Sequence, residues 1–405
     1  MRVLVISNLF PPHALGGYER SCADVVDRWR ASGHQVTVLA TSHRVDGVAA
    51  AEADAEGVER SLPSTSLYGE RAPLHRRPAV ERAARRVIDD AIDRVKPDVA
   101  LVWNVAGVPL SAVVRLTERR VPTLFVVADA WPVRSPGADP WVAPFSGSAA
   151  RRSIGRLMAV ATGVPTAAPP WDQLGRWVFC SASLRDHVAK KTGMDFSGAA
   201  VVPLGVDPHD FPVDRAGSGR TARSWRWRLL FVGRLAALKG IDTLVRTLSL
   251  LPRETTLDVV GPAEPEHVDR VLRLAEDLAV ADRIRVASVP RRELAGHYRA
   301  GDVCVFPSEW DEPFGIVPLE AMACSTPVAA SGTGGSAEYL RDGVNCVLAA
   351  PGDPTAIAAA LHRLADDPAL RARIVEGGWA TAASLTADQL ASRLEELALV
   401  LVGGA

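Results

Sequence analysis

The stretch MRVLVISNLFPPHALGGYER, Met1–Arg20, opens the chain and decides its fold. Val3–Ser7 is a continuous apolar run, which is typical of a strand buried on both faces of a parallel sheet. A loop rich in proline and glycine follows, and Tyr18–Ala31 then has the apolar spacing of a helix. Gly33 ends this helix and Val36–Ala40 is the next strand pattern, so the stretch begins a β-α-β unit.

The same alternation continues along the chain. Further strand and helix patterns occur at 79–95, Pro97–Trp103, 110–119 and Thr123–Val127. The alternation breaks around VPLGVDPHDFP, residues 202–212, and the polar tract Asp214–Ser224 is the best candidate for a linker. Beyond it the alternation restarts, with patterns at Leu229–Val232, 240–251, Thr256–Val260, 266–278, Ile284–Val286 and Val303–Pro307.

A chain of 405 residues with two such halves predicts an α/β protein of two doubly wound, Rossmann-like parallel-sheet domains facing a central cleft. We expect an N-terminal domain over 1–208, joined by a C-terminal helix at 385–402, and a C-terminal domain over 209–384. Ligands of doubly wound sheets bind outside the carboxyl ends of the strands. The loops that follow strands are therefore where a site is expected.

Composition narrows the classes of partner. Lysine and arginine number 46 against 47 acidic residues, which does not favour a nucleic-acid partner. The five cysteines are scattered, odd in number and without a CxxC pair, which indicates a reduced, cytoplasmic protein without a disulfide framework or zinc site. The N-terminus lacks the features of a signal peptide, and no run of eighteen apolar residues is present. Peripheral membrane contact stays open.

Residues 131–177 form the least regular part of the sequence. Four tryptophans lie there among many prolines, and two interpretations stay open: an irregular packed excursion, or an aromatic wall for an acceptor molecule. Within this part, Arg151–Gly163 (RRSIGRLMAVATG) has a basic flank and an apolar face, which makes contact with a membrane surface conceivable.

The first loop places glycines where a strand passes into a helix. Gly16 and Gly17 allow close approach of the backbone to a ligand, and the N-terminus of the helix attracts anions. The GxGxxG fingerprint of dinucleotide sites is absent. The alternative is a tight turn that needs two glycines. His13 is either a solvated loop residue or a functional one.

The second half opens with FVGRLAALKG, Phe231–Gly240. Gly233 gives room after the strand, and Arg234 and Lys239 follow in the loop and at the helix start. An arginine fork and a lysine charge suit a diphosphate. The alternative, two surface cations, is disfavoured by the helix dipole.

The stretch EPFGIVPLE, residues 312–320, places a carboxylate at each end of an apolar segment. With Glu320 in the second turn of a helix over 316–324, the carboxylates are separated by roughly 12 Å, too far for a glycosidase pair. Between them the amides of Gly315–Val317 would offer an anion seat. The pattern fits a clamp for an elongated ligand with a hydroxyl-rich group at each end and phosphate between. The alternative makes Glu312 a cap of the helix and Glu320 a solvated residue.

Taken together, these motifs resemble the retaining glycosyltransferases of the GT-B fold, family 4, also described as glycosyl transferases group 1. The resemblance rests on the glycine pair after the first strand, GRLxxxKG at 233–240 and PSEWDEPFGIVPLEAMA at 307–323. It also includes GHQV, VVPLGVDPHDF, AGDVCVFPS and TPVAASGTGGSAEYLRDGVN. The fragment VVADAWP lacks a histidine that many members have near the end of that strand.

The resemblance implies roles for individual residues. Glu320 would bind the ribose, Glu312 the donor sugar, and Arg234 and Lys239 the diphosphate. Asp129 is the nearest candidate for an acceptor or sugar contact, or else caps the following loop. The catalytic candidates are Glu312, Arg234, Lys239, Asp129 and His13. The donor-binding candidates are Gly16, Gly17, Gly233, Arg234, Lys239, Arg285, Val289, Glu312, Phe314, Gly315, Ile316, Val317 and Glu320.

The implied activity is retaining transfer of a sugar from a nucleotide diphosphate sugar, UDP- or GDP-linked, to a hydroxyl of a small-molecule, glycan or lipid acceptor. Neither a metal nor another cofactor is expected. Two alternatives remain open, a nucleotide-sugar 2-epimerase of the same fold and a non-catalytic nucleotide-sugar-binding protein.

Overall fold

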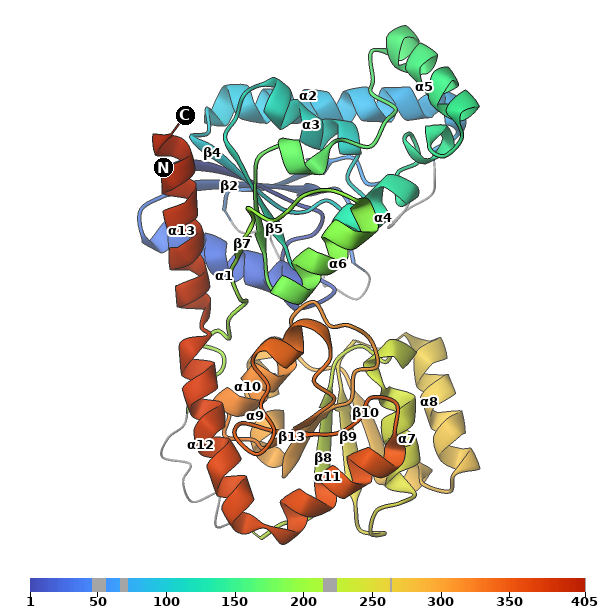
Figure 1. Ribbon diagram of the computed structural model, residues 1–405, viewed down its shortest axis with the longest axis vertical. Helices are drawn as coiled ribbons and strands as arrows, with labels where there is room; N and C mark the ends of the chain where they lie inside the picture. The colour runs from blue at the N-terminus through green and yellow to red at the C-terminus, as the bar shows by residue number, and fades with distance from the viewer. Residues whose placement is uncertain (46–55, 66–71, 214–223, 263, 405) are drawn as a thin grey trace. The chain divides into compact units, whose positions relative to one another are not determined.

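Figure 1 shows a computed structural model of the chain, which describes residues 1–45, 56–65, 72–213, 224–262 and 264–404. The chain divides into two compact units. Unit 1 comprises Met1–Pro203 and Leu390–Ala405, and unit 2 comprises Leu204–Gln389. The boundaries predicted from sequence, at 208 and 385, stand a few residues from these. The predicted linker at 214–224 lies, except for Ser224, outside the described residues.

Unit 1 is built on a seven-stranded parallel sheet with the strand order β3-β2-β1-β4-β5-β6-β7. Its strands are β1 Arg2–Ser7, β2 Gln35–Thr41, β3 Val58–Leu62, β4 Val99–Asn104, β5 Thr123–Val127, β6 Arg176–Phe179 and β7 Ala200–Val201. Its helices are α1 Gly17–Ala31, α2 Arg77–Val95, α3 Leu110–Glu118, α4 Trp131–Ala138, α5 Ala149–Thr162, α6 Ala182–Thr192 and α13 Ala387–Gly403, the last of which begins in unit 2.

The opening stretch forms the centre of this sheet, as predicted. β1 lies between β2 and β4, and Val3–Ile6 is completely buried because helices cover both faces. The hydroxyl of Tyr18, in the first turn of α1, shares its proton between the backbone oxygens of Trp103 and Val126. These bonds tie the start of α1 to the carboxyl ends of β4 and β5, so the loop before α1 is held at the ligand-binding edge of the sheet.

The tryptophan-rich segment is a packed one. Trp131, Trp141 and Trp171 are at most 1% exposed, and Trp177 stacks on Phe125 with ring centroids 4.3 Å apart. The tryptophan rings therefore belong to the core of unit 1, and the interpretation as an aromatic wall for an acceptor is wrong. The segment is also more regular than expected, because it contains both α4 and α5.

Unit 2 is built on a six-stranded parallel sheet with the order β10-β9-β8-β11-β12-β13. Its strands are β8 Arg228–Val232, β9 Thr256–Val260, β10 Ile284–Ala287, β11 Val303–Phe306, β12 Val328–Ala330 and β13 Val347–Leu348. Its helices are α7 Ile241–Leu248, α8 Pro265–Asp277, α9 Arg291–Ala300, α10 Val317–Ala323, α11 Pro354–Asp366 and α12 Pro368–Ser384.

The chain passes between the units twice, after Pro203 and after Gln389. Backbone hydrogen bonds within unit 2 join the two segments next to these crossings. The amide of Val206 donates to the oxygen of Leu385 at 2.9 Å, and the amide of Ala387 donates to the oxygen of Val206 at 3.0 Å. Gly205 has to be glycine, since a Cβ there would lie 2.0 Å from the backbone of Thr386.

After the second crossing, α13 packs on the rest of unit 1, as expected. The indole nitrogen of Trp29 donates to the oxygen of Ala391 at 3.0 Å, and His34 Nε2 lies 2.7 Å from Glu395 Oε1. Among the described residues, the helices are all too short or too polar to cross a membrane.

Candidate active site

The predicted phosphate and sugar ligands of the second half gather on the loops that follow β8 and β11. These two strands are neighbours in the sheet, so the loops at their carboxyl ends meet. Gly240, at the start of α7, adopts φ 73°, and a Cβ there would lie 1.9 Å from the oxygen of Pro307. The close approach brings the Arg234–Lys239 loop against the loop that leads to Glu312.

Glu312 is buried and bound by side chains from both loops. Its carboxylate accepts hydrogen bonds from Lys239 Nζ at 2.7 and 3.0 Å and from the Ser308 hydroxyl at 2.6 Å, and the residue is 4% exposed. The N-cap of α10 is Ile316, so the interpretation of Glu312 as a helix cap is wrong. A carboxylate this deeply buried needs such partners, and Lys239 and Ser308 supply them. Its contact with a ligand stays a prediction.

The two predicted cations differ in their surroundings. Lys239 is about one-fifth exposed, and its Nζ lies 5.3 Å from the centre of the Trp310 ring as well as against Glu312. Arg234 is exposed and forms no hydrogen bond or ion pair with any residue that the structure describes. One cation therefore balances a buried carboxylate, and the other has its donors available for an anion.

Glu320 lies in the first turn of α10, one turn earlier than predicted, because the helix begins at Val317. It is 5% exposed, so the alternative of a solvated residue is wrong. The hydroxyl of Tyr298, from α9, donates to Glu320 Oε2 at 2.7 Å. Burial, and next the charge of Glu320, raise the pKa of Tyr298 well above its ordinary value, so the phenol stays protonated and remains a donor.

Tyr339 holds the segment between the two glutamates. Gly315 adopts φ 84° and its oxygen accepts a hydrogen bond from the hydroxyl of Tyr339, whose ring lies 5.3 Å from that of Phe314. Phe314 is buried, and Ile316 and Val317 are half-buried. Since α10 has only seven residues, its dipole is small, and any anion seat here would depend on the individual amides.

The remaining donor-side candidates lie on or after other strands of the same sheet. Gly233 donates its amide to the oxygen of Val260, which joins the ends of β8 and β9. Arg285 is exposed on the edge strand β10, and Val289 is half-buried in the turn before α9. Their contact with the donor stays a prediction.

The four candidates of the first half belong to unit 1. His13 is buried rather than solvated: its Nδ1 accepts from the amide of Val45 at 3.1 Å and its Nε2 lies 3.0 Å from Arg44 Nη1. Asp129 accepts from the amide of Trp131 at 2.8 Å and from Arg134 at 2.7 Å, the contacts of the capping alternative. A further role of Asp129 toward an acceptor stays a prediction.

Gly16 and Gly17 are exposed at the start of α1. Gly16 has φ −166°, a conformation open to any residue, and a Cβ there would meet only Glu19 Oε2, at 3.8 Å. Packing therefore does not require glycine at position 16, and close approach of a ligand to it stays a prediction.

Three residues of the site were not predicted. Ser308 and Tyr298 hold the two glutamates, and Trp310 lies under Lys239 with a buried indole nitrogen that has no partner among the described residues. Ser308 and Trp310 precede Glu312 in the same loop, so a search of that loop for donors would have found them. Tyr298 comes from another helix, α9, and no sequence motif pointed to it.

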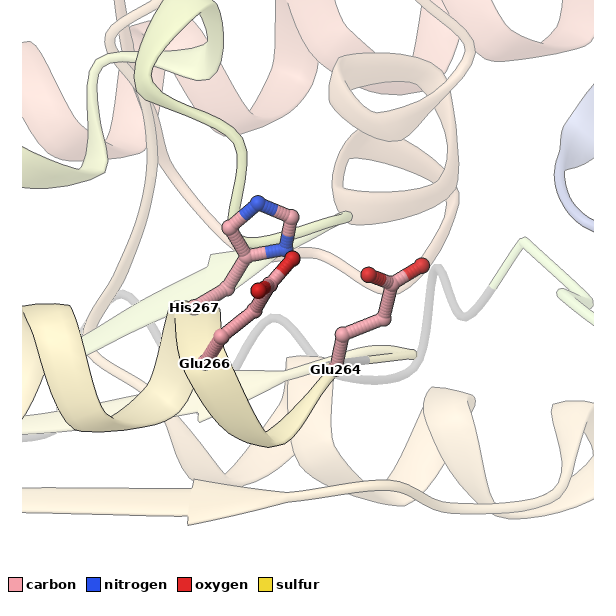
Figure 2. Close-up of side chains that lie close together, drawn as sticks. All are labelled: Glu264, Glu266 and His267. Carbon is pink, nitrogen blue, oxygen red and sulfur yellow. The ribbon is translucent and has the colours of Figure 1, made fainter.

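A group with metal-ligating side chains lies elsewhere in unit 2. Figure 2 shows Glu264, Glu266 and His267 at the start of α8, with one possible ligand atom from each within 4.8 Å of the others. The two glutamates are exposed, and such acidic groups are common without an ion. We therefore assign no metal to it.

Unit 1 contains a small pocket lined by the start of α2 and by residues that follow β3 and α4. Ser64, Arg77, Glu81 and Trp141 are among the lining residues. Glu81 is 2% exposed and accepts a hydrogen bond from Ser111 at 2.6 Å. Burial, and next the neighbouring Asp139, raise the pKa of Glu81 from 4.5 to about 8.

Comparison with known families matches both halves of the chain. A model described as Glycosyltransferase Family 4 matches residues 15–210, and a model described as Glycosyl transferases group 1 matches residues 221–379. A D-inositol 3-phosphate glycosyltransferase from Xylanimonas cellulosilytica is 41% identical over 221 residues, which is 52% of this chain and 53% of the relative. The chain thus spans about half the length of that curated relative.

Solved structures resemble the chain over its whole length. Sucrose-phosphate synthase from Thermosynechococcus elongatus superposes with a TM-score of 0.74 at 21% identity, covering 100% of this chain and 99% of that one. HepE from Anabaena, solved in complex with UDP and glucose, superposes with a TM-score of 0.69 at 18% identity, covering 98% and 99%. At these identities the likeness concerns the fold, and it confirms the predicted fold class.

Proposed function

The chain belongs to glycosyltransferase family 4, and on this premise we propose that it is an enzyme that transfers a sugar from a nucleotide diphosphate sugar to a hydroxyl of an acceptor. The observation that carries the proposal is the arrangement of Glu312, Lys239 and Ser308, with Arg234 exposed on the same loop as Lys239. A buried carboxylate accepts sugar hydroxyls, and the two cations suit the diphosphate beside it.

We propose a UDP-linked sugar as the donor. The complex of HepE with UDP and glucose supports this choice, since that protein has the same fold. In this chain Glu320 would accept the ribose hydroxyls, with Tyr298 fixing the position of the carboxylate. Glu312 would accept hydroxyls of the transferred sugar, while Arg234 and Lys239 would contact phosphate oxygens.

The chemistry follows from where charge develops. The bond between the anomeric carbon and the diphosphate oxygen breaks, which leaves positive charge on the sugar and an additional negative charge on the diphosphate. Lys239 and Arg234 would stabilise the charge that develops on the diphosphate, as preorganised cations do in enzyme sites. The acceptor oxygen bonds to the anomeric carbon on the same face, and its proton passes to the departing phosphate. Configuration is retained, and these cations take the place of a metal.

The acceptor is proposed only as a class. The relative named for D-inositol 3-phosphate makes phosphorylated polyols the first acceptors to test. Glycan and lipid hydroxyls come next. The scattered cysteines support a location in the reducing cytoplasm.

The test is a panel of UDP- and GDP-sugars, each incubated with the protein alone and with inositol 3-phosphate, simple polyols or lipid acceptors, with products identified by mass and by NMR. Transfer with retained anomeric configuration in the presence of a metal chelator supports the proposal. Formation of an epimer without acceptor would instead identify an epimerase. Tight binding with no turnover across the panel would indicate a binding protein.

A further inference from the structure

Helix α5 presents an apolar face to the outside of unit 1. Ile154, Leu157 and Val160 recur every three residues and are 54%, 72% and 86% exposed. Gly155, on the opposite side, is the one buried residue of this helix, and a Cβ there would lie 2.8 Å from Phe145 and 2.9 Å from Thr166. The helix is thus seated by its glycine side, and its large apolar side chains point away from the unit.

The edges of this face are basic. Arg151, Arg152 and Arg156 are exposed, and Ala149–Thr162 contains no acidic residue. With about 100° per residue, Arg151 and Arg156 lie on opposite sides of Leu157, each roughly 100–120° away. A further exposed arginine, Arg82 of α2, donates to the oxygen of Thr162 at the end of α5 at 3.1 Å.

The combination of an apolar face and arginine borders selects one kind of occupant. Membrane-surface helices bury an apolar face at the level of the acyl chains and keep cationic residues among anionic headgroups, which long arginine side chains can reach. A second copy of the chain is disfavoured, because two such faces would bring six arginines together without a compensating acid. In contrast, the exposed Leu399 and Val400 of α13 follow Glu395 and Glu396, so charge does not favour a membrane there.

We propose that α5 docks unit 1 onto the surface of an anionic lipid bilayer. Ile154, Leu157 and Val160 insert at the boundary between headgroups and acyl chains. Arg151 and Arg156, at the two edges of this face, contact lipid phosphates. The docking does not depend on the proposed transferase activity, because α5 contributes no residue to the candidate active site.

The first test is sedimentation of the full chain with vesicles of equimolar phosphatidylcholine and phosphatidylglycerol, against vesicles of phosphatidylcholine alone. Binding is expected only to the anionic vesicles, falling as salt rises. Leu157→Ser with Val160→Ser should lower the vesicle partition coefficient by at least about tenfold, since each large side chain contributes roughly 1.5–3 kcal/mol of burial. Arg151→Glu with Arg156→Glu should lower it by about tenfold or more, at ~1 kcal/mol for each arginine removed.

Matched controls place the same substitutions at exposed positions elsewhere. Leu399→Ser with Val400→Ser, and Arg246→Glu in unit 2, should leave vesicle binding unchanged. Equal effects of these controls, or no binding to anionic vesicles, would overturn the proposal. Self-association that is lost in Leu157→Ser, without lipid binding, would reassign the face to a second copy.

A second readout reports insertion directly. Since all five native cysteines are buried, Leu157→Cys can be labelled selectively with an environment-sensitive dye. Its emission should shift to the blue with anionic vesicles, while a dye at Leu399→Cys should not respond. An unshifted emission at position 157 with bound protein would show that another surface contacts the lipid.

Discussion

Glu312 and Glu320 are buried at similar depth, yet different kinds of donor hold them. A lysine and a serine bind Glu312, whereas a tyrosine hydroxyl binds Glu320. The spacing of the two glutamates and the loop with Lys239 could be predicted, because these residues lie in two short local motifs. Tyr298 could not, because a hydrogen bond from α9 to α10 depends on how two helices pack, which no local pattern specifies.

The ion pair of Lys239 and Glu312 gives a prediction in which stability and activity separate. Lys239→Ala leaves a buried carboxylate without its cation and should lower the free energy of unfolding by about 2–3 kcal/mol. Adding Glu312→Gln removes the stranded charge and should restore most of this stability, measured by urea unfolding, while activity stays lost.

Arg234→Ala is the matched control. Because Arg234 is exposed and has no partner among the described residues, unfolding should be unchanged while transfer and UDP binding weaken. For the ion pair itself, the double variant Lys239→Ala with Glu312→Gln should be more stable than Lys239→Ala alone. Equal stability of the two would contradict the assigned role of the ion pair.

Tyr298→Phe tests whether Glu320 needs its buried donor. The substitution keeps the ring and its packing but removes the hydroxyl. The free energy of unfolding should therefore fall by about 1–2 kcal/mol. If Tyr298 positions Glu320, UDP affinity measured by calorimetry should also fall several-fold. Unchanged UDP affinity together with lowered stability would reduce Tyr298 to a purely structural residue.

At the scale of elements, buried strands could be predicted from the sequence, whereas a polar edge strand and a helix with two prolines could not. Thr123–Val127 was predicted with the bounds it has, because TLFVV is a buried run with four apolar residues in succession. Thr256–Val260 was also predicted with its bounds, although TLDVV includes Asp258. β3 was missed because VERSL is polar, as an edge strand allows. α4 was missed since prolines at 132 and 136 obscure its helical spacing.

The contact between α2 and α3 predicts how stability depends on pH. Folding raises the pKa of Glu81 from 4.5 to about 8, so between these values the folded state holds a proton that the unfolded state has released. The contribution of Glu81 to the free energy of unfolding is therefore fully present below pH 4.5 and is lost as the pH rises toward 8. Each kcal/mol lost should lower the melting temperature by roughly 2–4 °C.

Glu81→Gln provides the comparison. Its amide keeps a hydrogen-bonding group near Ser111 but does not titrate, so the decline in melting temperature between pH 4.5 and 8 should be smaller than in the parent. Parallel pH profiles of the two proteins would contradict the assignment of this proton to Glu81.

At the scale of the whole molecule, α13 completes unit 1 with residues from the far end of the sequence. Leu394 is completely buried, whereas Leu399, on the same helix, is 50% exposed. Leu394→Asp should destabilise unit 1 by more than about 3 kcal/mol, since it buries a charge without a partner, and Leu399→Asp should change stability by less than about 0.5 kcal/mol. Differential scanning calorimetry would measure both, and equal effects would show that α13 is not packed as described.

The joined crossings at Val206 and Leu385 have a mechanical consequence. If the chain is stretched from its two ends in an optical trap, the load first acts within unit 1, because both gripped segments belong to it. Unit 2 feels the pull only after α13 has peeled away and the hydrogen bonds between Val206, Leu385 and Ala387 have ruptured. The order of rupture under tension is thus set by the path of the backbone, whichever unit is the more stable to heat.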